Sequence, residues 1–382
     1  MEYFTSNEEK SIYINTQPHI EALSYYFNKF FAAYGTERLY ECKEVWIKPN
    51  ITGIEIPERG KTSQPLVLEA LIDTIMKFRQ ACDIYVADSS VIGCNTIEAA
   101  KKSGIYDVCN KKGVTFVDLR NLRYQNVDIK NHFGIKELNI SYPFLTNDIF
   151  KINLAKLKSV YGSPIGFTIK NSKGIISDDD KLSFHENSLQ NCLCDLALNV
   201  NWDISILEGF PISELGVPGG VGPFGISDSS ILLDCIMCYV VGIDFKNVGH
   251  INQLSKTIKS INELLESNDL KILRSTCKPL MYSKNWLEDI SKENNVEIVN
   301  GNPCSACLES FAKTTSIFNS QAKNISIIIG SSFKETNCSK RSICIGNCAI
   351  STYGASDFTA IGCPPTIDSM KEVITKAMSM VD

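Results

Sequence analysis

The chain has 382 residues, a formal net charge of −5 and a hydrophobic content of 44%. Its length allows two domains, and its composition is typical of ordinary globular proteins. The acidic balance argues against a nucleic-acid-binding protein, because phosphate binding usually needs a basic face. The sequence contains no apolar run of about eighteen residues and no apolar signal segment, so it predicts neither a membrane span nor export. We therefore expect a cytoplasmic protein.

Fifteen cysteines are many for a chain of this length. Their odd number fits poorly with complete disulfide pairing, and a reduced, anaerobic cytoplasm accounts for free thiols. Nine of them stand mostly among apolar or helical neighbours, where cysteine usually acts as a small buried hydrophobe. These nine are Cys42, Cys82, Cys94, Cys109, Cys192, Cys194, Cys235, Cys238 and Cys277.

Strands and helices are predicted to alternate in the first part of the chain. Helical spacing of apolar residues covers 19–34, 65–79 and 96–103, and short buried strands are expected at 44–48, 83–87 and 114–118. This alternation predicts an α/β fold with a Rossmann-like, mostly parallel sheet flanked by helices. None of the loops carries the glycine pattern of a nucleotide-binding site.

Polar residues follow the predicted strands of this sheet. Lys48 and Asn50 end the first strand, Asp88 ends the second, and Asp118 ends the third. Ligands of such folds bind beyond the carboxyl ends of the strands. A small-molecule site is therefore expected at this edge.

Lysines recur after a further predicted strand at 149–154. Lys156, Lys158 and Lys170 lie in a glycine-containing segment that could bind a carboxylate or phosphate. The alternative is a solvated basic face on a loop-rich connector. In a catalytic interpretation, these lysines neutralise substrate charge and His185 or Asp88 acts as the acid or base, although His185 is equally well explained as a loop residue.

The strand predicted at 204–208 leads into residues 209–225, which are rich in glycine and proline. We expect a long flexible loop here. Its glycines would let the backbone come close to a ligand, or the loop is a mobile surface lid with no catalytic role. Asp228 is a candidate cap for the next helix. Asp234 stands in an apolar run and needs a polar partner if it is buried.

A second, smaller α/β module with many cysteines is predicted over residues 266–382, after a first domain over 1–265. Short turn-rich segments there surround a predicted buried strand at 325–330. Four cysteines of these segments are the candidate metal ligands: Cys304, Cys307, Cys348 and Cys363. Soft thiolates select iron–sulfur clusters or zinc, and we favour a [4Fe–4S] cluster. Cys338 and Cys344 are reserve ligands.

Short motifs that recur in order over roughly residues 44–250 resemble the family called domain of unknown function 362. The motifs are Ile47-Lys48-Pro49-Asn50, Thr62-Ser63-Gln64-Pro65, Ala87-Asp88-Ser89, Asn153 to Lys158, Ile169 to Gly174, Lys181 with His185, Glu208-Gly209, Gly222 to Gly225, Asp228 to Asp234, and Gly242 to Asp244. The resemblance implies a cytoplasmic α/β domain, often accompanied by iron–sulfur ligands. With it, the expected substrate-binding residues are Lys48, Asn50, Thr62, Ser63, Asn171, Glu208, Gly222 and Asp234.

The C-terminal module carries a separate resemblance. Gly346-x-Cys348, followed by Gly362-Cys363-Pro364-Pro365, is similar to the cluster loop in the small subunits of complex I and nickel–iron hydrogenases. Those proteins supply their other cysteines upstream. This resemblance favours iron–sulfur over zinc.

Three functions remain open from the sequence. The first is an iron–sulfur oxidoreductase acting on an anionic small molecule. The second is a non-enzymatic electron-transfer protein for a partner oxidoreductase, and the third is a binding protein whose cysteines hold structural zinc.

Overall fold

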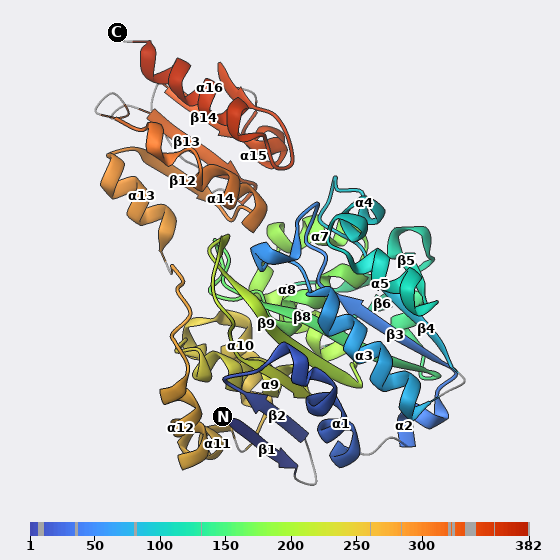
Figure 1. Ribbon diagram of the computed structural model, residues 1–382. Coiled ribbons are helices and arrows are strands. Elements are labelled where there is room, and N and C mark those ends of the chain that lie inside the picture. Colours follow the sequence, from blue (N-terminus) through green and yellow to red (C-terminus); the bar gives the residue numbers. More distant parts are fainter. Residues whose placement is uncertain are drawn as a thin grey trace. The chain divides into compact units, whose positions relative to one another are not determined.

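The computed structural model describes residues 1–6, 11–34, 37–79, 82–130, 132–259, 261–283, 285–319, 322, 325–332, 341–354 and 356–380. The chain forms two compact units. The first comprises Met1–Ser159, Ile165–Lys181 and Gln190–Met281, and the second comprises Val160–Pro164, Leu182–Leu189 and Tyr282–Asp382. Each unit contains its own sheet flanked by helices (Figure 1). The predicted fold class is confirmed for both.

The sheet of the first unit has the strand order β1-β2-β11-β9-β8-β3-β4-β5, with β10 paired to β9. Its central strands β9, β8, β3, β4 and β5 are parallel, whereas β1, β2, β10 and β11 pair antiparallel. The strands are β1 (Glu2–Ser6), β2 (Ser11–Asn15), β3 (Glu44–Pro49), β4 (Asp83–Asp88), β5 (Thr115–Asp118), β8 (Ile149–Lys158), β9 (Ile204–Glu214), β10 (Val217–Pro218) and β11 (Phe224–Ser227). A separate antiparallel pair is formed by β6 (Tyr124–Asp128) and β7 (Glu137–Ser141).

Helices cover the sheet where the sequence places apolar faces. Helix α3 (Pro65–Phe78) begins with proline at its first position, which needs no amide hydrogen there. Its buried face packs with α1 (Leu23–Tyr34) and α5 (Ile105–Lys112) in one core cluster with β3, β4, β8 and β9. Helices α6 (Thr168–Asn171) and α9 (Ser230–Val240) also contact the sheet, at β8 and β9.

The remaining helices follow the chain order. They are α2 (Glu37–Glu41), α4 (Thr96–Lys102), α7 (Asp178–Glu186), α8 (Leu189–Asn199), α10 (Gly249–Leu254), α11 (Ile261–Glu266), α12 (Asn268–Thr276), α13 (Trp286–Asn294), α14 (Ser305–Ala312), α15 (Gly346–Tyr353) and α16 (Ile367–Ser379). Short 3-10 helices lie at Ile20–Ala22, Pro57–Arg59, Leu119–Asn121, Tyr142–Leu145, Ser172–Ile175, Phe245–Asn247, Ser255–Thr257 and Thr315–Ile317.

Three sequence predictions need correction. Strand β8 extends to Lys158, so Lys156 and Lys158 are buried strand residues rather than members of a loop or a solvated face. Strand β9 extends to Glu214 and pairs with β10 and β11, so ordered strands replace much of the expected flexible loop. The cap of α9 is Ser229, because Asp228 accepts the amide of Ser11 instead.

The second unit contains a four-stranded parallel sheet in the order β12-β13-β14-β15. Its strands are β12 (Glu297–Gly301), β13 (Ile325–Gly330), β14 (Arg341–Ile345) and β15 (Phe358–Ala360). The strand predicted at 325–330 is confirmed. Because successive strand residues face opposite sides, Ile327 packs with α14 and α16 on one face, and Ile328 packs with α15 on the other.

Within the described ranges, none of the helices combines the length and apolarity that crossing a membrane would require.

Candidate functional site

The predicted strand ends of the first unit come together in a buried polar network. Lys48 Nζ at the end of β3 lies 2.8 Å from Asp88 Oδ1 at the end of β4, and both side chains are almost fully buried. Asp88 also accepts the amides of Ile51 and Ser89. Burial lowers the pKa of Lys48, although the Asp88 carboxylate opposes this effect. The pair therefore fixes the loops after two neighbouring strands.

Three asparagines extend this network toward β8. Asn171 Oδ1 accepts from Lys48 Nζ at 3.0 Å and from Asn50 Nδ2 at 2.8 Å. Asn171 Nδ2 donates to Asn153 Oδ1 at 2.7 Å. Lys48, Asn50, Asp88 and Asn171, which were separate sequence predictions, thus form one group.

Gly174 lies directly against the Lys48–Asp88 pair. A Cβ atom at this position would overlap Asp88 Oδ1 and Lys48 Cε. We expect Gly174→Ala to lower the free energy of unfolding by about 1–3 kcal/mol, because overpacking forces the buried pair apart. Gly53→Ala is the control, since its Cβ would have no atom within 4 Å. Equal denaturant midpoints for the two variants would contradict the prediction.

A second buried ion pair joins β8 to β9. Lys156 Nζ lies 2.9 Å from each carboxylate oxygen of Glu208 and donates to the Phe210 carbonyl at 2.9 Å. Both side chains are 0% exposed, and burial lowers the pKa of Lys156 against the opposing effect of Glu208. Glu208 also accepts the amides of Gln64 and Phe210. An ammonium group neutralised in this way has little charge to offer a bound anion.

Lys158 binds the loop that follows β3. Its Nζ donates to Asn50 Oδ1 at 2.6 Å, to Thr52 Oγ1 at 2.7 Å and to the Lys61 carbonyl at 2.7 Å. The predicted residues Thr62 and Ser63 lie in the same loop and form hydrogen bonds with the backbone. Their hydroxyls donate to the carbonyls of residues 50 and 154, at 2.8 and 3.0 Å.

Gly222 and Asp234 also have structural contacts. The Gly222 amide donates to the Gly209 carbonyl at 2.8 Å, and a Cβ on Gly209 would lie 2.8 Å from the Gly222 carbonyl carbon. Asp234 is buried and accepts the amides of Thr168 and Ile169, which confirms that it needs a polar partner. Burial raises its pKa to about 7.

One part of this edge was not predicted as a site, although Lys181 belongs to one of the family-like motifs. Lys181 Nζ contacts Ser89 Oγ at 2.7 Å and Asp178 Oδ1 at 2.8 Å, and Arg120 donates to Asp178 Oδ2 at 2.9 Å. Burial lowers the pKa of Lys181, although Asp178 opposes this effect. Arg120 follows Asp118 after β5, so its position beyond a strand end was the available signal.

Lys170 and His185 are the other two predicted catalytic residues. Lys170 is half-buried in α6, and its charge acts on the buried imidazole of His250. His185 is half-buried and belongs to the second unit, whereas Lys156, Lys158, Lys170 and Asp88 belong to the first. The structure therefore groups Asp88 with Lys48 at the strand ends.

His250 gives a pH prediction. Its Nδ1 donates to Gln190 Oε1 at 2.6 Å, and burial, followed by the charge of Lys170, lowers its pKa to about 3. The unfolded state binds a proton near pH 6.5 and the folded state does not. As the pH is lowered from about 6.5 to about 3, the free energy of unfolding should therefore decrease. This group contributes up to about 1.4 kcal/mol per pH unit to the decrease.

Chemical denaturation at several pH values tests this contribution. The variant His250→Gln should show a flatter dependence than the unsubstituted protein, because it removes the group that titrates only in the unfolded state. His132→Gln, at an exposed position, is the matched control and should leave the slope unchanged. An unchanged slope in His250→Gln would contradict the assignment.

The four candidate cysteines of the second unit follow three of its parallel strands. Cys304 comes after β12 and caps α14, with its Sγ 3.5 Å from the Cys307 amide. Cys348 lies in the first turn of α15, after β14, and Cys363 follows β15. Because carboxyl ends of parallel strands meet at one edge, these loops approach one another. Asn347 joins two of them, through paired hydrogen bonds with Gly362 at 3.0 and 2.9 Å.

The candidate cysteines are close enough to change one another's pKa values. The hydrogen bond with Cys304, then burial, then the charges of Cys304, Cys363 and Cys348 raise the pKa of Cys307. Burial and the other thiols likewise raise the pKa values of Cys348 and Cys363. A Cβ on Gly346 would lie 3.2 Å from Cys307 Sγ, so the loop after β14 passes close to that thiol. The arrangement is a set of thiols that come from separate loops.

Cys344 and Cys338 were the reserve candidates for metal ligands. Cys344 is fully buried in β14, where it packs with Ile328 and Ala349 on the α15 side of the sheet. Cys338 lies outside the described residues. Among the described side chains, no three from histidine, cysteine, aspartate or glutamate are gathered in a group that could hold one metal ion.

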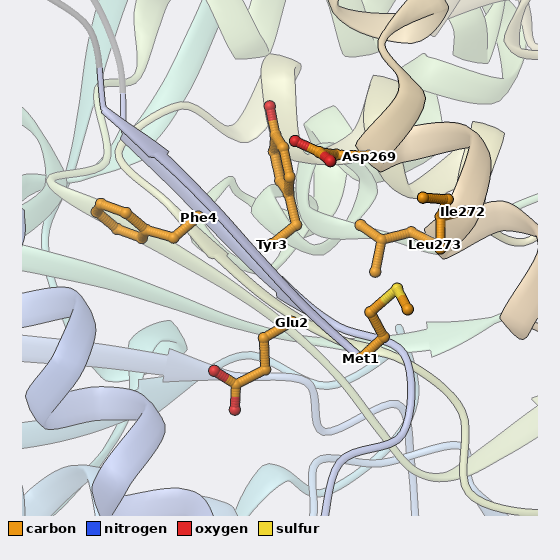
Figure 2. A pocket seen from close by; sticks show the side chains of 7 residues that line it. All are labelled: Met1, Glu2, Tyr3, Phe4, Asp269, Ile272 and Leu273. Carbon is orange, nitrogen blue, oxygen red and sulfur yellow. The ribbon is translucent and has the colours of Figure 1, made fainter.

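A pocket of about 260 Å³ lies between β1 and α12 (Figure 2). Its lining contains none of the predicted site residues. The Tyr3 hydroxyl points toward the Asp269 carboxylate in Figure 2, and burial, followed by that carboxylate, raises the Tyr3 pKa. A tyrosine with a raised pKa stays protonated near neutral pH, so it offers no phenolate there to act as a base.

The first unit is thus an α/β domain whose parallel strands end in buried lysines, carboxylates and asparagines. The chain belongs to the family described as Domain of unknown function (DUF362), whose model matches residues 45–239, about half of the chain. No curated protein and no solved structure matches the chain.

Proposed function

We propose that the second unit binds a [4Fe–4S] cluster through Cys304, Cys307, Cys348 and Cys363, and that the protein is an iron–sulfur oxidoreductase. The observation that carries this proposal is geometric: all four cysteines follow the carboxyl ends of strands in one parallel sheet. They are close enough together that the charge of Cys304 raises the pKa values of Cys307, Cys348 and Cys363. Cys307, Cys348 and Cys363 therefore resist deprotonation, and a cationic metal centre would reverse this by stabilising the thiolates.

The donor set supports a cluster. All four donors are cysteine sulfurs, which are the usual ligands of [4Fe–4S] centres. They lie on loops and helix starts beyond the strands, where a bulky group can be accommodated without interrupting the sheet. A bound cluster would supply one-electron transfer, which is why the proposal is a redox function.

The first unit supports an additional substrate-binding role. Its strand ends carry charged groups in a family-defining segment, which is where ligands of parallel α/β folds bind. Since Lys156 is neutralised by Glu208, an anionic substrate would depend on other cations, such as the half-buried Lys170. An electron-transfer protein without its own substrate is the alternative within the same redox class.

Metal analysis of the full chain tests the proposal. The protein is purified without oxygen, its absorption spectrum is recorded, and iron, sulfide and zinc are assayed on the same sample. We expect broad absorption at roughly 400 nm and about four irons and four sulfides per chain. Zinc without sulfide would overturn the redox proposal and indicate a binding protein with a structural zinc site.

A further inference from the structure

A second pocket in the first unit has a volume of about 350 Å³. This is at the lower end of the range of about 300–1,000 Å³ found for small-molecule sites. Its lining residues are Pro18, His19, Ile20, Glu21, Gln64, Phe210, Pro211 and Val221. The pocket lies beside the segment that continues β9 past Glu208.

The chemistry of the lining restricts the ligand. Five of the eight residues are apolar, and the side chains that can carry charge are the exposed Glu21 and His19. The lining contains no lysine or arginine. An apolar wall favours a ring-containing molecule, and a carboxylate at the rim favours a positive or uncharged polar group over an anion.

The buried ion pair of β8 and β9 holds one wall of the pocket in place. The Phe210 carbonyl accepts from Lys156 Nζ at 2.9 Å and from Gln64 Nε2 at 3.2 Å. The Gln64 amide donates to Glu208 Oε1 at 3.0 Å. Two lining residues are therefore fixed by the same buried charges, so this part of the pocket is formed before a ligand arrives.

A further lining residue, Val221, precedes the Gly209–Gly222 crossing. The hydrogen bond between these glycines positions Val221, whose side chain is 63% exposed. Val217, in β10, is equally exposed at 64% but does not line the pocket. The two valines form a natural pair for comparison.

We propose that this pocket binds a small ring-containing molecule that is uncharged or cationic. The site is separate from the proposed cluster ligands, and the inference does not depend on the proposed redox function. Binding would bury the ring against Phe210, Pro211 and Val221, with the polar group of the ligand toward Glu21.

The test uses proflavine, a cationic aromatic dye, titrated into the full chain and followed by fluorescence anisotropy. We expect saturable binding at one site per chain, with naphthalene-2-sulfonate, an anion of smaller ring size, competing weakly or not at all. Val221→Lys should weaken proflavine binding at least about fivefold, because it removes an apolar contact and places a like charge at the wall. Val217→Lys adds the same charge to the chain and should change binding less than about twofold.

Glu21→Gln provides an independent variant at another lining residue of the pocket. It should weaken proflavine binding about two- to fivefold at low salt and have a smaller effect at high salt, because the carboxylate is exposed. Thermal unfolding checks that each variant is folded. Equal losses in the two lysine variants, equal competition by the anion, or no saturable binding below 1 mM proflavine would overturn the proposal.

Discussion

Replacing Cys307 by serine is expected to abolish the absorption at roughly 400 nm and to reduce bound iron and sulfide to a small fraction of the unsubstituted level. Cys307 interacts with Cys304, Cys348 and Cys363, so its loss removes a central member of the sulfur group. Serine offers a hydroxyl that stays protonated and binds iron poorly. The measurement is iron, sulfide and absorption on anaerobically purified protein.

Cys82→Ser is the control for this experiment. Cys82 is also a half-buried free thiol, but it lies in the first unit and has no part in the sulfur group. It should leave the iron and sulfide contents unchanged. If Cys307→Ser retains full iron and sulfide, the proposed ligand set is wrong. If both variants lose them equally, the effect is not specific to the proposed site.

Replacing Lys156 by methionine is expected to lower the free energy of unfolding of the first unit by about 3–5 kcal/mol. The substitution leaves the fully buried Glu208 carboxylate without its cation, and the desolvation cost of that charge is no longer offset. The double variant Lys156→Met with Glu208→Gln should be less destabilised than the sum of the two single variants, because it leaves no unpaired charge.

Tryptophan fluorescence can isolate the first unit in this measurement. The chain has three tryptophans, of which Trp46 and Trp202 lie in the first unit and Trp286 in the second. Urea unfolding in a Trp286→Phe background therefore reports the first unit alone. Lys111→Met is the control, because Lys111 is 64% exposed in its pair with Glu69 and should cost less than about 1 kcal/mol. Equal costs for the two lysines would refute the buried-pair argument.

The buried lysines also limit how function can be assigned to family motifs. Lys156 and Glu208 belong to motifs that suggested substrate binding, yet each makes several hydrogen bonds within the fold. The same contacts hold Phe210 and Gln64 at the second pocket. Substitutions of these residues will therefore alter stability and pocket shape together, and activity losses in such variants need a stability measurement beside them.

The sequence by itself determined the α/β class and most positions of the early elements. Apolar residues at helical spacing and proline at the first turn specify α3, and short apolar runs specify β3, β4 and β13, because these are local properties of the chain. The sequence also predicted that Asp234 needs a hydrogen-bond partner, because its carboxyl group stands in an apolar run.

Tertiary structure decided what the polar residues contact. Lys156 was predicted either to bind an anionic ligand or to lie on a solvated basic face. Its sequence neighbours do not reveal Glu208, which comes next to it only when β8 and β9 pair. The glycines at 209 and 222 suggested a flexible loop, but their close crossing between paired strands requires the absence of side chains. Likewise, Cys304 and Cys363 are far apart in sequence, and parallel pairing of β12 to β15 brings their loops to one edge. Such long-range pairings depend on the whole sheet, and no local pattern specifies them.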